Sequence, residues 1–487
     1  MKRLLSILLV ITMLISLSGC KLINRIFGKN KDKDKDPPEE PTYTEMSFNG
    51  VSIKDYKIVC DAEGLDYNVR AAEYIRDGIK RVTGYAPAIV DDSESKHGHE
   101  IVVGETSREL SRDLNQPLSG VQFSMLAKGG SVALEGNYFV IAAAAYYFVN
   151  TYVKAGNVEI KDAVLVREPE VKEAKNYILL IGDGMGLYQT LLYDYLTDTS
   201  DYSDGENVFY GYMLPNRGFS RTNSYSGTTD SAAGGTALST GYKTNNSYVG
   251  LDRDGNEIKS LTELAAELGK ATAVMSTEAS TGATPASFSS HTLDRDNSDD
   301  IRNGQTALTE KYGTVIECGF DYYTARYMKS SIEKRITDTL NKVSADSDGF
   351  FLMYEEAHID KHSHDNDMEK TFLALIRFNQ AIGRFMEFAF YNPGTVVIIT
   401  ADHETGALLP GEDGALAYNS VNHSSANVPV FAWGMGTDYF GGETVENINI
   451  AHFISSAMGV NDFGDRTRGW YSEIYGGGTE LPIIPIG

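Results

Sequence analysis

Residues 228–241 read Thr-Thr-Asp-Ser-Ala-Ala-Gly-Gly-Thr-Ala-Leu-Ser-Thr-Gly. The small residues after Asp230 predict a helix that other backbone can approach closely, and Gly241 can end that helix. Ser231 would then lie at the N-terminus of the helix, where free N–H groups and the helix dipole favour a negatively charged oxygen. The alternative for this stretch taken alone is a serine that only caps a tightly packed helix. The rest of the chain decides between the two interpretations.

Apolar strand-like segments alternate with helical segments across residues 175–475. The predicted strands are Tyr177–Ile181, Ala271–Met275, Phe350–Tyr354 and Thr395–Thr400, and the predicted helices are Leu261–Leu268, Ile332–Val343 and Met368–Phe390. This alternation is typical of a largely parallel sheet that helices cover on both faces. Ligands bind such sheets at the carboxyl ends of the strands. We therefore expect an α/β catalytic domain over 175–475, with its site at that edge.

Polar side chains follow three of these strands. Asp183 lies in the glycine-rich loop after the first strand, where a carboxylate would repel a pyrophosphate, so a metal fits this loop better than a dinucleotide. Asp360 and His364 follow the third strand four residues apart, and one helical turn would face both toward a single cation. The fourth strand and the chain beyond it add Asp402, His403 and His423. Imidazole with carboxylate suits zinc, whereas an all-oxygen set suits magnesium.

With these motifs in place, the catalytic half resembles the alkaline phosphatase family. The motifs that match in order are residues 176–186, 228–250, 277–295, 351–364, 395–406 and 422–424. The resemblance implies that Ser231 is the nucleophile and becomes phosphorylated during turnover. It also implies that Arg295 binds the phosphate and that Lys361 reaches the phosphate through water.

The same resemblance implies three metal ions. One zinc ion would be held by Asp183, Asp402 and His403, the second zinc ion by Asp360, His364 and His423, and a magnesium ion by Asp183, Thr284 and Glu355. Two metal ions about 4 Å apart can stabilise both the attacking and the leaving oxygen of an in-line displacement. The implied reaction is the hydrolysis of phosphate monoesters. The alternatives are a phosphodiesterase or sulfatase of the same superfamily and, from another class, an inactive surface binding protein.

Gly282 departs from the family pattern. An aspartate or a histidine usually precedes the motif Ala283-Thr284-Pro285, where it supports the third metal or the phosphate-binding arginine. Magnesium needs near-ideal octahedral geometry, so the loss of such a partner would weaken or change the metal bound there. We expect Gly282→Asp to change the metal dependence or the turnover. His358 and His362 match no family role, and we expect them behind the ligands or facing solvent.

The first twenty residues read as an export signal. A basic start and an apolar run over residues 2–17 lead to Leu17-Ser18-Gly19-Cys20, which resembles a bacterial lipoprotein cleavage box. The resemblance implies a lipid on Cys20, an anchor in the cell membrane and an extracytoplasmic location. Residues 21–44 are charged and rich in proline, which predicts a disordered tether.

Residues 45–168 predict a second, smaller α/β domain. Its predicted strands are Tyr56–Cys60, Glu100–Val103 and Val132–Glu135, and its predicted helices are Asn68–Val82 and Phe139–Val153. The stretch carries neither a nucleophile nor metal-ligand spacing, and His97 and His99 are expected in a loop. It resembles the non-catalytic N-terminal domain of some glycoside hydrolases. The resemblance implies an accessory role, with a glycan as the partner it suggests.

Length and charge limit the remaining possibilities. The 487 residues favour two domains, and residues 476–487 are expected to form a C-terminal tail. Acidic residues outnumber basic ones by 67 to 43, for a net charge of −24, so nothing in the charge favours nucleic acid or an anionic membrane surface as a partner. Cys60 and Cys318 fall in different predicted domains and are expected to be unpaired and buried. The oligomeric state stays open, a homodimer included.

Overall fold

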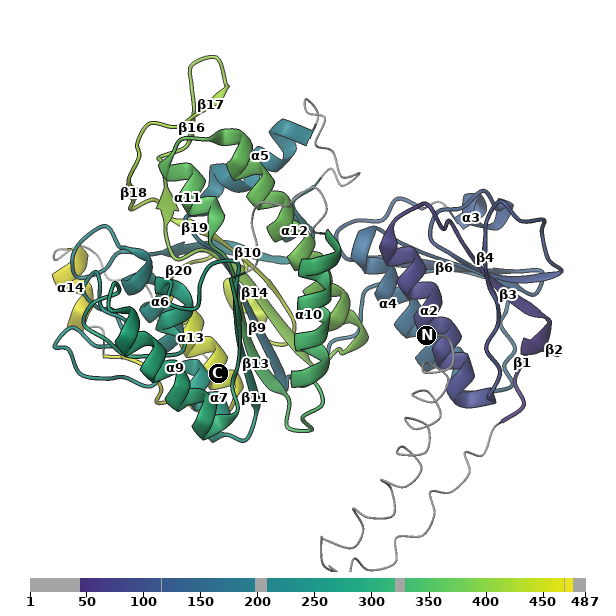
Figure 1. Cartoon of the computed structure of the whole chain (residues 1–487). Coiled ribbons are helices and arrows are strands. Elements are labelled where there is room, and N and C mark those ends of the chain that lie inside the picture. Colours follow the sequence, from purple (N-terminus) through teal and green to yellow (C-terminus); the bar gives the residue numbers. More distant parts are fainter. Residues whose placement is uncertain (1–43, 115, 198–207, 320–328, 468, 476–487) are drawn as a thin grey trace, which may run out of the picture. The chain divides into compact units, whose positions relative to one another are not determined.

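The computed structural model describes residues 44–114, 116–197, 208–319, 329–467 and 469–475 (Figure 1). The predicted signal peptide with Cys20, residues 21–43 of the predicted tether and the tail over 476–487 lie outside these residues. Residues 45–487 form one compact unit. Two sheets organise it, one in each of the two stretches for which α/β structure is predicted.

The larger sheet has eight strands and is largely parallel. In spatial order they are β12 (Val315–Cys318), β11 (Ala271–Ser276), β13 (Phe350–Glu356), β9 (Asn176–Gly182), β14 (Thr395–Thr400), β19 (Val428–Trp433), β10 (Asn216–Arg221) and β20 (Thr444–Glu446). The first five run parallel, whereas β19 is antiparallel to both of its neighbours. The predicted parallel core is therefore confirmed, and an antiparallel strand makes the sheet mixed.

Helices cover both faces of this sheet because its central strands are apolar on both sides (Figure 1). Ile178 and Leu180 of β9 belong to the hydrophobic cluster that includes α12 (Met368–Tyr391) and α10 (Lys329–Val343). The alternate residues of β9 belong to the cluster of the other face, with α7 (Leu261–Glu267) and α13 (Asn447–Ala457). A continuous apolar strand is typical of a parallel sheet buried on both faces.

The remaining elements of the catalytic part lie around this sheet. The helices are α5 (Leu187–Thr197), α6 (Ser231–Thr240), α8 (Ala283–Ser287), α9 (Ser298–Tyr312), α11 (His358–His364) and α14 (Gly469–Tyr475), with short 3-10 helices over Tyr210–Met213 and Thr437–Phe440. Two small antiparallel pairs are β15 (Glu404–Thr405) with β18 (His423–Ser424), and β16 (Leu409–Pro410) with β17 (Leu416–Ala417).

The smaller sheet has six strands. In spatial order they are β4 (Ile89–Asp91), β3 (Tyr56–Cys60), β5 (His99–Val103), β7 (Ser131–Gly136), β6 (Phe123–Lys128) and β8 (Ala163–Arg167). The helices of this part are α2 (Asp66–Thr83), α3 (Glu109–Leu114) and α4 (Ile141–Phe148), with 3-10 turns over Ile53–Asp55 and Tyr138–Val140 and a π-helical turn over Val149–Val153, and Ser47–Phe48 (β1) pairs with Val51–Ser52 (β2). His99 begins β5, so the loop predicted for it is wrong, and its ring lies against Tyr56.

A shared hydrophobic cluster links the elements of the smaller sheet to helix α12. Phe139 and Tyr210 make an edge-to-face contact with ring centroids 4.9 Å apart, and the ring of Tyr74 in α2 stacks on Tyr391 at 4.2 Å. Arg70 of α2 also pairs with Glu387 of α12 at 2.9 Å. The two sheets are therefore parts of one core rather than separately buried units.

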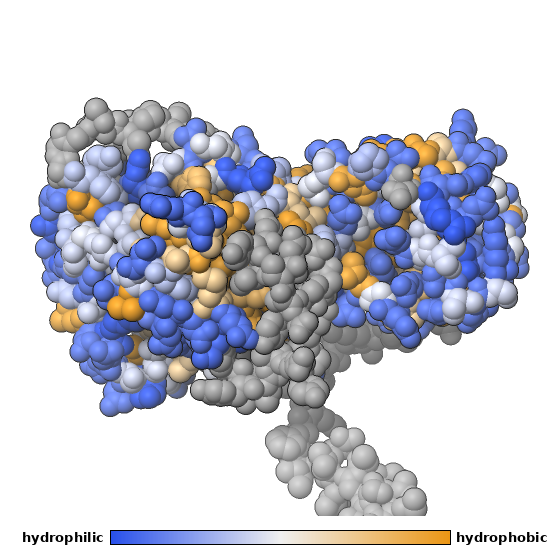
Figure 2. Space-filling view, turned by 90° about the horizontal axis from the view of Figure 1, so that it is seen from above, coloured by the Kyte–Doolittle hydropathy of each residue, from blue (hydrophilic) through white to orange (hydrophobic). Residues whose placement is uncertain are grey.

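The surface is mostly polar. The face shown in Figure 2 is predominantly hydrophilic, with smaller hydrophobic areas between the polar side chains. Among the described residues, no helix combines the length and the hydrophobicity needed to cross a membrane. Cys60 and Cys318 are both free, as predicted, but only Cys60 is buried; Cys318 at the end of β12 is partly exposed, so its predicted burial is wrong.

Candidate active site

Helix α6 places Ser231 at its first position. Asp230 caps the helix by accepting a hydrogen bond from the backbone N–H of Ala233 at 2.9 Å, and Gly241 ends it with a left-handed backbone (φ 73°). Ser231 is almost fully buried. The predicted helix is confirmed, with Asp230 rather than the serine as its capping residue. The N–H groups of the first turn and the helix dipole therefore act at the Ser231 hydroxyl.

The small residues of α6 allow the close approach that the sequence predicts. A Cβ atom at Gly234 would lie 2.9 Å from the carbonyl oxygen of Asp402. Such contacts are shorter than side-chain carbons normally make with backbone. Gly234 thus lets α6 lie directly against the loop that follows β14.

The carboxyl ends of three neighbouring parallel strands lie beside Ser231. In β13, β9 and β14, Glu355, Ile181 and Thr400 are aligned in register. The residues that follow these strands therefore lie at one edge of the sheet. The predicted clusters come from this edge.

The first cluster joins Asp183, Asp402 and His403. His403 Nε2 lies 3.5 Å from Asp183 Oδ1 and 3.4 Å from Asp402 Oδ2. The Ser231 Oγ atom lies 3.2 Å from the same nitrogen. Asp402 Oδ1 accepts hydrogen bonds from the backbone N–H groups of Gly184 and His403, so Oδ2 is the oxygen that faces the cluster.

The second cluster joins Asp360, His364 and His423. The Asp360 Oδ1 atom lies 3.3 Å from His364 Nε2 and 3.5 Å from His423 Nε2, and the two nitrogens are 3.0 Å apart. Asp360 and His364 come from one turn of α11, as their spacing predicts. His423 comes from β18, more than fifty residues further along the chain.

Hydrogen bonds fix which nitrogen of each imidazole faces the clusters. His364 Nδ1 donates to the Val421 carbonyl at 2.6 Å, and His423 Nδ1 donates to the Thr229 carbonyl at 2.9 Å. The Thr405 hydroxyl donates to Asp360 Oδ1 and accepts from His403 Nδ1. In their neutral forms all three rings therefore turn an unprotonated Nε2 toward the site, which is the form that binds metals.

The two clusters fit metal ions. Three ligand atoms lie within 4.8 Å of one another in the set Asp183–Asp402–His403 and in the set Asp360–His403–His423, which contains His403 in place of His364. The ligand atoms of Asp360, His364 and His423 are themselves 3.0–3.5 Å apart. A tetrahedral zinc with bonds of 2.0–2.1 Å holds its ligands about 3.3 Å apart, close to the separations in both clusters. No N–H or O–H group among the described residues donates to Asp183 Oδ1 or Asp402 Oδ2, although both atoms are buried. Buried oxygens without such a donor are the expected signature of a cation site.

Uncompensated negative charge marks the first cluster. Burial, with the charges of Asp402 and Asp360, raises the pKa of Asp183 well above its ordinary value. Burial and the charge of Asp360 raise the pKa of Asp402 to about 7. Burial and the neighbouring His423 lower the pKa of His403 well below its ordinary value, so this ring is neutral. A bound cation would supply the missing positive charge.

The residues implied for the third metal also lie together. Glu355 is the last residue of β13 that is aligned with β11, and it is fully buried. Thr284 of α8 is also fully buried. Burial and the charge of Glu278 raise the pKa of Glu355 well above its ordinary value, and the nearby hydroxyls of Ser276, which donates to Glu355 Oε2, and of Thr284 act in the opposite direction. The carboxyl group thus lies between two hydroxyls and near a second acid, an all-oxygen environment of the kind that magnesium prefers.

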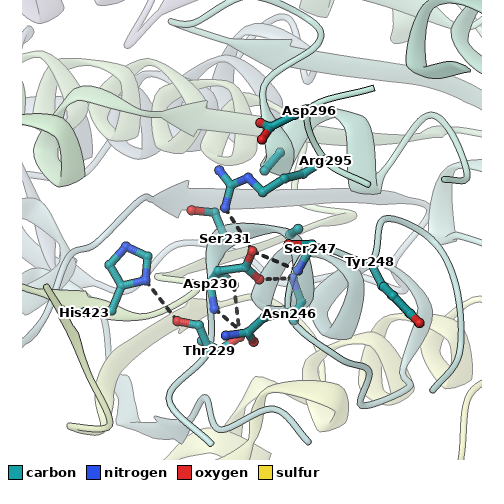
Figure 3. A network of polar contacts seen from close by, with 12 residues as sticks. Thr229, Asp230, Ser231, Asn246, Ser247, Tyr248, Arg295, Asp296 and His423 are labelled. Carbon is teal, nitrogen blue, oxygen red and sulfur yellow. Dashed lines mark hydrogen bonds and ion pairs between the residues drawn. The ribbon is translucent and has the colours of Figure 1, made fainter. Parts of the chain in front are cut away.

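Arg295 lies next to Ser231 because Asp230 holds it there (Figure 3). Its NH1 atom is 3.1 Å from Asp230 Oδ2, which also accepts from the backbone N–H of Ser247 at 2.9 Å. Figure 3 shows the guanidinium directed at this carboxylate, with Ser231 beside it. A guanidinium carries five N–H donors, so this pair leaves donors for two oxygens of a phosphate.

The other predicted residues take different positions. Lys361 Nζ pairs with Glu278 Oε2 at 2.6 Å, a partner that the sequence analysis does not name. His358 lies 3.2 Å from Glu356, whose buried carboxylate also pairs with Arg377 at 2.7 Å. His362 is also mostly buried. Neither histidine faces solvent, so the solvent-facing position expected for them is not observed.

The sequence does not predict a functional role for three residues of the site, which are Asp230, Glu278 and Thr405. Asp230 precedes the serine, and an acid before a run of small residues is a recognisable cap signal. Thr405 follows Asp402 and His403 closely, but a threonine in a loop carries no signal of its own. The contact between Glu278 and Lys361 joins residues 83 positions apart and has no local signal.

The fold and the site together define a class of α/β proteins in which a serine at a helix N-terminus faces clusters of imidazole and carboxylate groups that could hold metal ions. A family model described as alkaline phosphatase matches residues 174–320 and 317–414. Alkaline phosphatase 3 of Bacillus subtilis (strain 168) is 32% identical over 311 residues, which cover 53% of this chain and 67% of that protein. Alkaline phosphatase 4 of the same organism is 28% identical over 304 residues, which cover 51% of this chain and 65% of that protein. The chain thus spans about two thirds of the length of these relatives.

Solved structures agree with this assignment. The alkaline phosphatase from the Antarctic bacterium TAB5 is 26% identical with a TM-score of 0.52, and the match covers 60% of this chain and all of that one. The alkaline phosphatase of Thermus thermophilus, at 18% identity and a TM-score of 0.51, covers 60% of this chain and 93% of that one and shares the fold. The chain belongs to the alkaline phosphatase family, and it is a phosphatase.

Proposed function

We propose that this phosphatase hydrolyses phosphate monoesters through a phosphoserine on Ser231, with two zinc ions and one magnesium ion. The observation that carries the proposal is the position of Ser231 Oγ, 3.2 Å from His403 Nε2. That nitrogen is also within 3.5 Å of Asp183 and Asp402. The serine oxygen therefore lies where a fourth ligand of that cluster would lie.

The two clusters and the pair Thr284–Glu355 would hold the metal ions. The zinc ligands would be Asp183, Asp402 and His403 for one ion and Asp360, His364 and His423 for the other, and Asp183, Thr284 and Glu355 would hold magnesium. The metals would lower the pKa of Ser231 and of a bound water and would neutralise charge on the phosphoryl oxygens.

The residues of the chain bind and orient the phosphoryl group. The first turn of α6 favours negative charge at Ser231, and Arg295 can bind two phosphoryl oxygens through its planar fork. Ser231 Oγ attacks phosphorus as the bond between phosphorus and the leaving oxygen breaks, and the proton lost by the serine hydroxyl ends on the leaving alcohol. A water molecule then attacks phosphorus, the bond to Ser231 breaks, and the serine regains a proton as inorganic phosphate forms.

The same metal pair on this fold can also serve diesters or sulfates. A serine in place of threonine or a modified cysteine, together with Arg295 and the third-metal residues, favours monoesters. Hydrolysis of an aryl phosphate monoester, its diester and its sulfate by the purified protein tests this choice, before chelation, after chelation and after zinc is restored.

We expect monoester hydrolysis to dominate, to vanish with the chelator and to return with zinc. Acid-quenched protein should carry phosphate on Ser231, and Ser231→Ala should abolish both the label and turnover. Ser239→Ala is the matched control, because Ser239 lies in the same helix and its hydroxyl donates only within α6, to the Thr236 carbonyl. A dominant diester or sulfate rate would contradict the monoester assignment, and full activity in chelator would contradict the metal assignment. No turnover under any condition would favour an inactive binding protein.

A further inference from the structure

The carboxylate of Glu278 occupies the space of a side chain at position 282. A Cβ atom built on Gly282 would lie 1.7 Å from Glu278 Oε1 and 2.1 Å from its Cδ atom. The backbone of Gly282 (φ −62°, ψ 154°) is open to any residue. In the observed conformation of Glu278, its side chain, and not the backbone of position 282, therefore leaves room only for a glycine.

Glu278 is tied to the residues of the third metal site. Ser276 and Glu355 are aligned in the parallel pair β11–β13, and the Ser276 hydroxyl donates to Glu355 Oε2. The same hydroxyl accepts a hydrogen bond from the backbone N–H of Glu278 at 3.0 Å. One serine therefore links the backbone of Glu278 to the buried Glu355.

The two oxygens of Glu278 have different surroundings. Oε2 pairs with Lys361 Nζ at 2.6 Å, and Oε1 lies over Gly282, the residue that begins the turn into Thr284. The Glu278 side chain is only 16% exposed. A largely buried carboxylate thus lies between the lysine on one side and the Ala283-Thr284-Pro285 segment on the other.

From this geometry we infer that Glu278 supplies, from four residues upstream, the carboxylate that position 282 lacks, and that it supports the third metal site while holding Lys361 beside it. Glu278 is a positioning residue in this assignment. The inference rests on the proposed function, because the third metal ion is part of that proposal. In this chain, the carboxylate that supports the third metal site would come from position 278 instead of position 282.

Calorimetric titration with Mg²⁺ tests the inference without any measurement of turnover. The purified protein is stripped with a chelator and reloaded with zinc, and its zinc content is measured. Because residues that support metal ligands typically contribute 10–100-fold to metal affinity, Glu278→Gln should weaken Mg²⁺ binding by about tenfold or more and leave the zinc content unchanged. Glu267→Gln is the matched control, since this exposed glutamate forms a surface pair with Lys259.

A single and a double substitution at positions 278 and 282 provide a sharper test. Gly282→Asp alone should weaken Mg²⁺ binding, because the new side chain and Glu278 need the same space. Gly282→Asp combined with Glu278→Ala should bind Mg²⁺ more tightly than either single variant, because one carboxylate then has the space to itself.

The outcomes separate this inference from the proposed function. Equal Mg²⁺ affinity in Glu278→Gln and the parent protein would overturn the inference, as would a double variant no better than Glu278→Ala. A parent protein that binds no Mg²⁺ would also overturn it, even if zinc alone supports monoester turnover. A parent that binds Mg²⁺ as expected but hydrolyses no monoester would leave the inference standing and refute the proposed function.

Discussion

At the scale of single residues, Arg295 and Asp230 act as a pair. Asp230 caps α6 through one carboxylate oxygen and holds Arg295 through the other. Because the cap and the arginine share one side chain, the start of the helix and the position of the guanidinium cannot change independently. The arrangement places a fork of N–H donors beside Ser231 before any phosphate arrives.

Replacing Arg295 should therefore weaken phosphate binding. A hydrogen bond to a charged group contributes roughly 1.5–3 kcal/mol, so Arg295→Ala should raise the inhibition constant of inorganic phosphate by about tenfold or more. Arg295→Lys should recover only part of the loss, because an ammonium can pair with Asp230 but cannot bind two oxygens at once. Steady-state inhibition by phosphate measures both effects. Arg302→Ala, which removes an exposed arginine of α9, is the control, and an unchanged constant in Arg295→Ala would refute the role.

The chemical groups of the site could be predicted from the sequence, but their partners could not. Ser231, the aspartates and the histidines follow strands or open a helix, and parallel strand ends must meet at one edge. The ion pair of Lys361 with Glu278 depends on how a helix and a loop 83 residues apart pack together, which no local pattern contains. The same holds for Gly282, whose departure is visible in the sequence while the side chain that fills its space is not.

At the scale of elements, α6 and α13 meet end to side. His452 of α13 is buried, and its Nε2 donates to the carbonyl of Gly241, the residue that ends α6, at 3.1 Å. A Cβ atom at Gly241 would lie 2.8 Å from the ring of His452. The helix that carries the nucleophile is thus anchored at its C-terminal end by a neutral imidazole.

The burial of His452 makes stability depend on pH. Burial and the nearby Arg466 lower the pKa of His452 from 6.5 to about 4. Above pH 6.5 the ring is neutral in both the folded and the unfolded protein. As the pH falls below 6.5, the unfolded chain takes up the proton first, so stability should fall until the pH reaches about 4, by at most on the order of 3 kcal/mol.

Urea unfolding of chelator-treated protein between pH 7 and pH 4.5 measures this loss, because removal of metals excludes their release as a cause. His452→Gln should be less stable at pH 7 but should lose less stability on acidification than the parent protein. Identical pH dependence in the two proteins would refute the assignment.

The long apolar strands and helices were predictable, and the short or polar strands were not. β9, β11, β13 and β14 are apolar runs of six or seven residues, and each was predicted. β19 contains Pro429, which normally argues against a strand inside a sheet, and β10 (Asn-Arg-Gly-Phe-Ser-Arg) has one apolar side chain and no alternating pattern. β20 has three residues, too few for a pattern. These strands form because neighbouring strands complete their hydrogen bonds, a tertiary effect.

At the scale of the whole molecule, a buried ion cluster joins the parts that carry the two sheets. Glu387 of α12 pairs with Arg70 of α2 and also with Arg384 of α12, and its side chain is 5% exposed. With the aromatic contacts between the same helices, it makes residues 45–487 one compact unit. The division into domains at 45–168 and 175–475, the glycoside hydrolase resemblance and the glycan partner stay predictions.

Loss of Glu387 should destabilise the entire unit. Glu387→Ala leaves two partly exposed guanidinium groups without their carboxylate, so the cost should be below the roughly 3–5 kcal/mol typical of fully buried pairs but above that of a surface pair. Urea unfolding followed by both near-UV and far-UV circular dichroism should show one transition that shifts as a whole. Asp299→Ala, which breaks an exposed pair with Arg302, should change stability by less than about 1 kcal/mol. A loss of similar size in both variants, or separate transitions for the two sheets, would contradict the shared core.

The space shared by Glu278 and Gly282 has a consequence for how such an enzyme can change over generations. A side chain at position 282 and the Glu278 side chain in its observed conformation need the same space, so a change at one position affects the other. One intermediate has side chains at both positions that need the same space, and the other intermediate has a carboxylate at neither position. Under the inference about Glu278, each order of mutation passes through a form with a weakened third site, so single changes at either position should be disfavoured. In related sequences the identities at these two positions should vary in step.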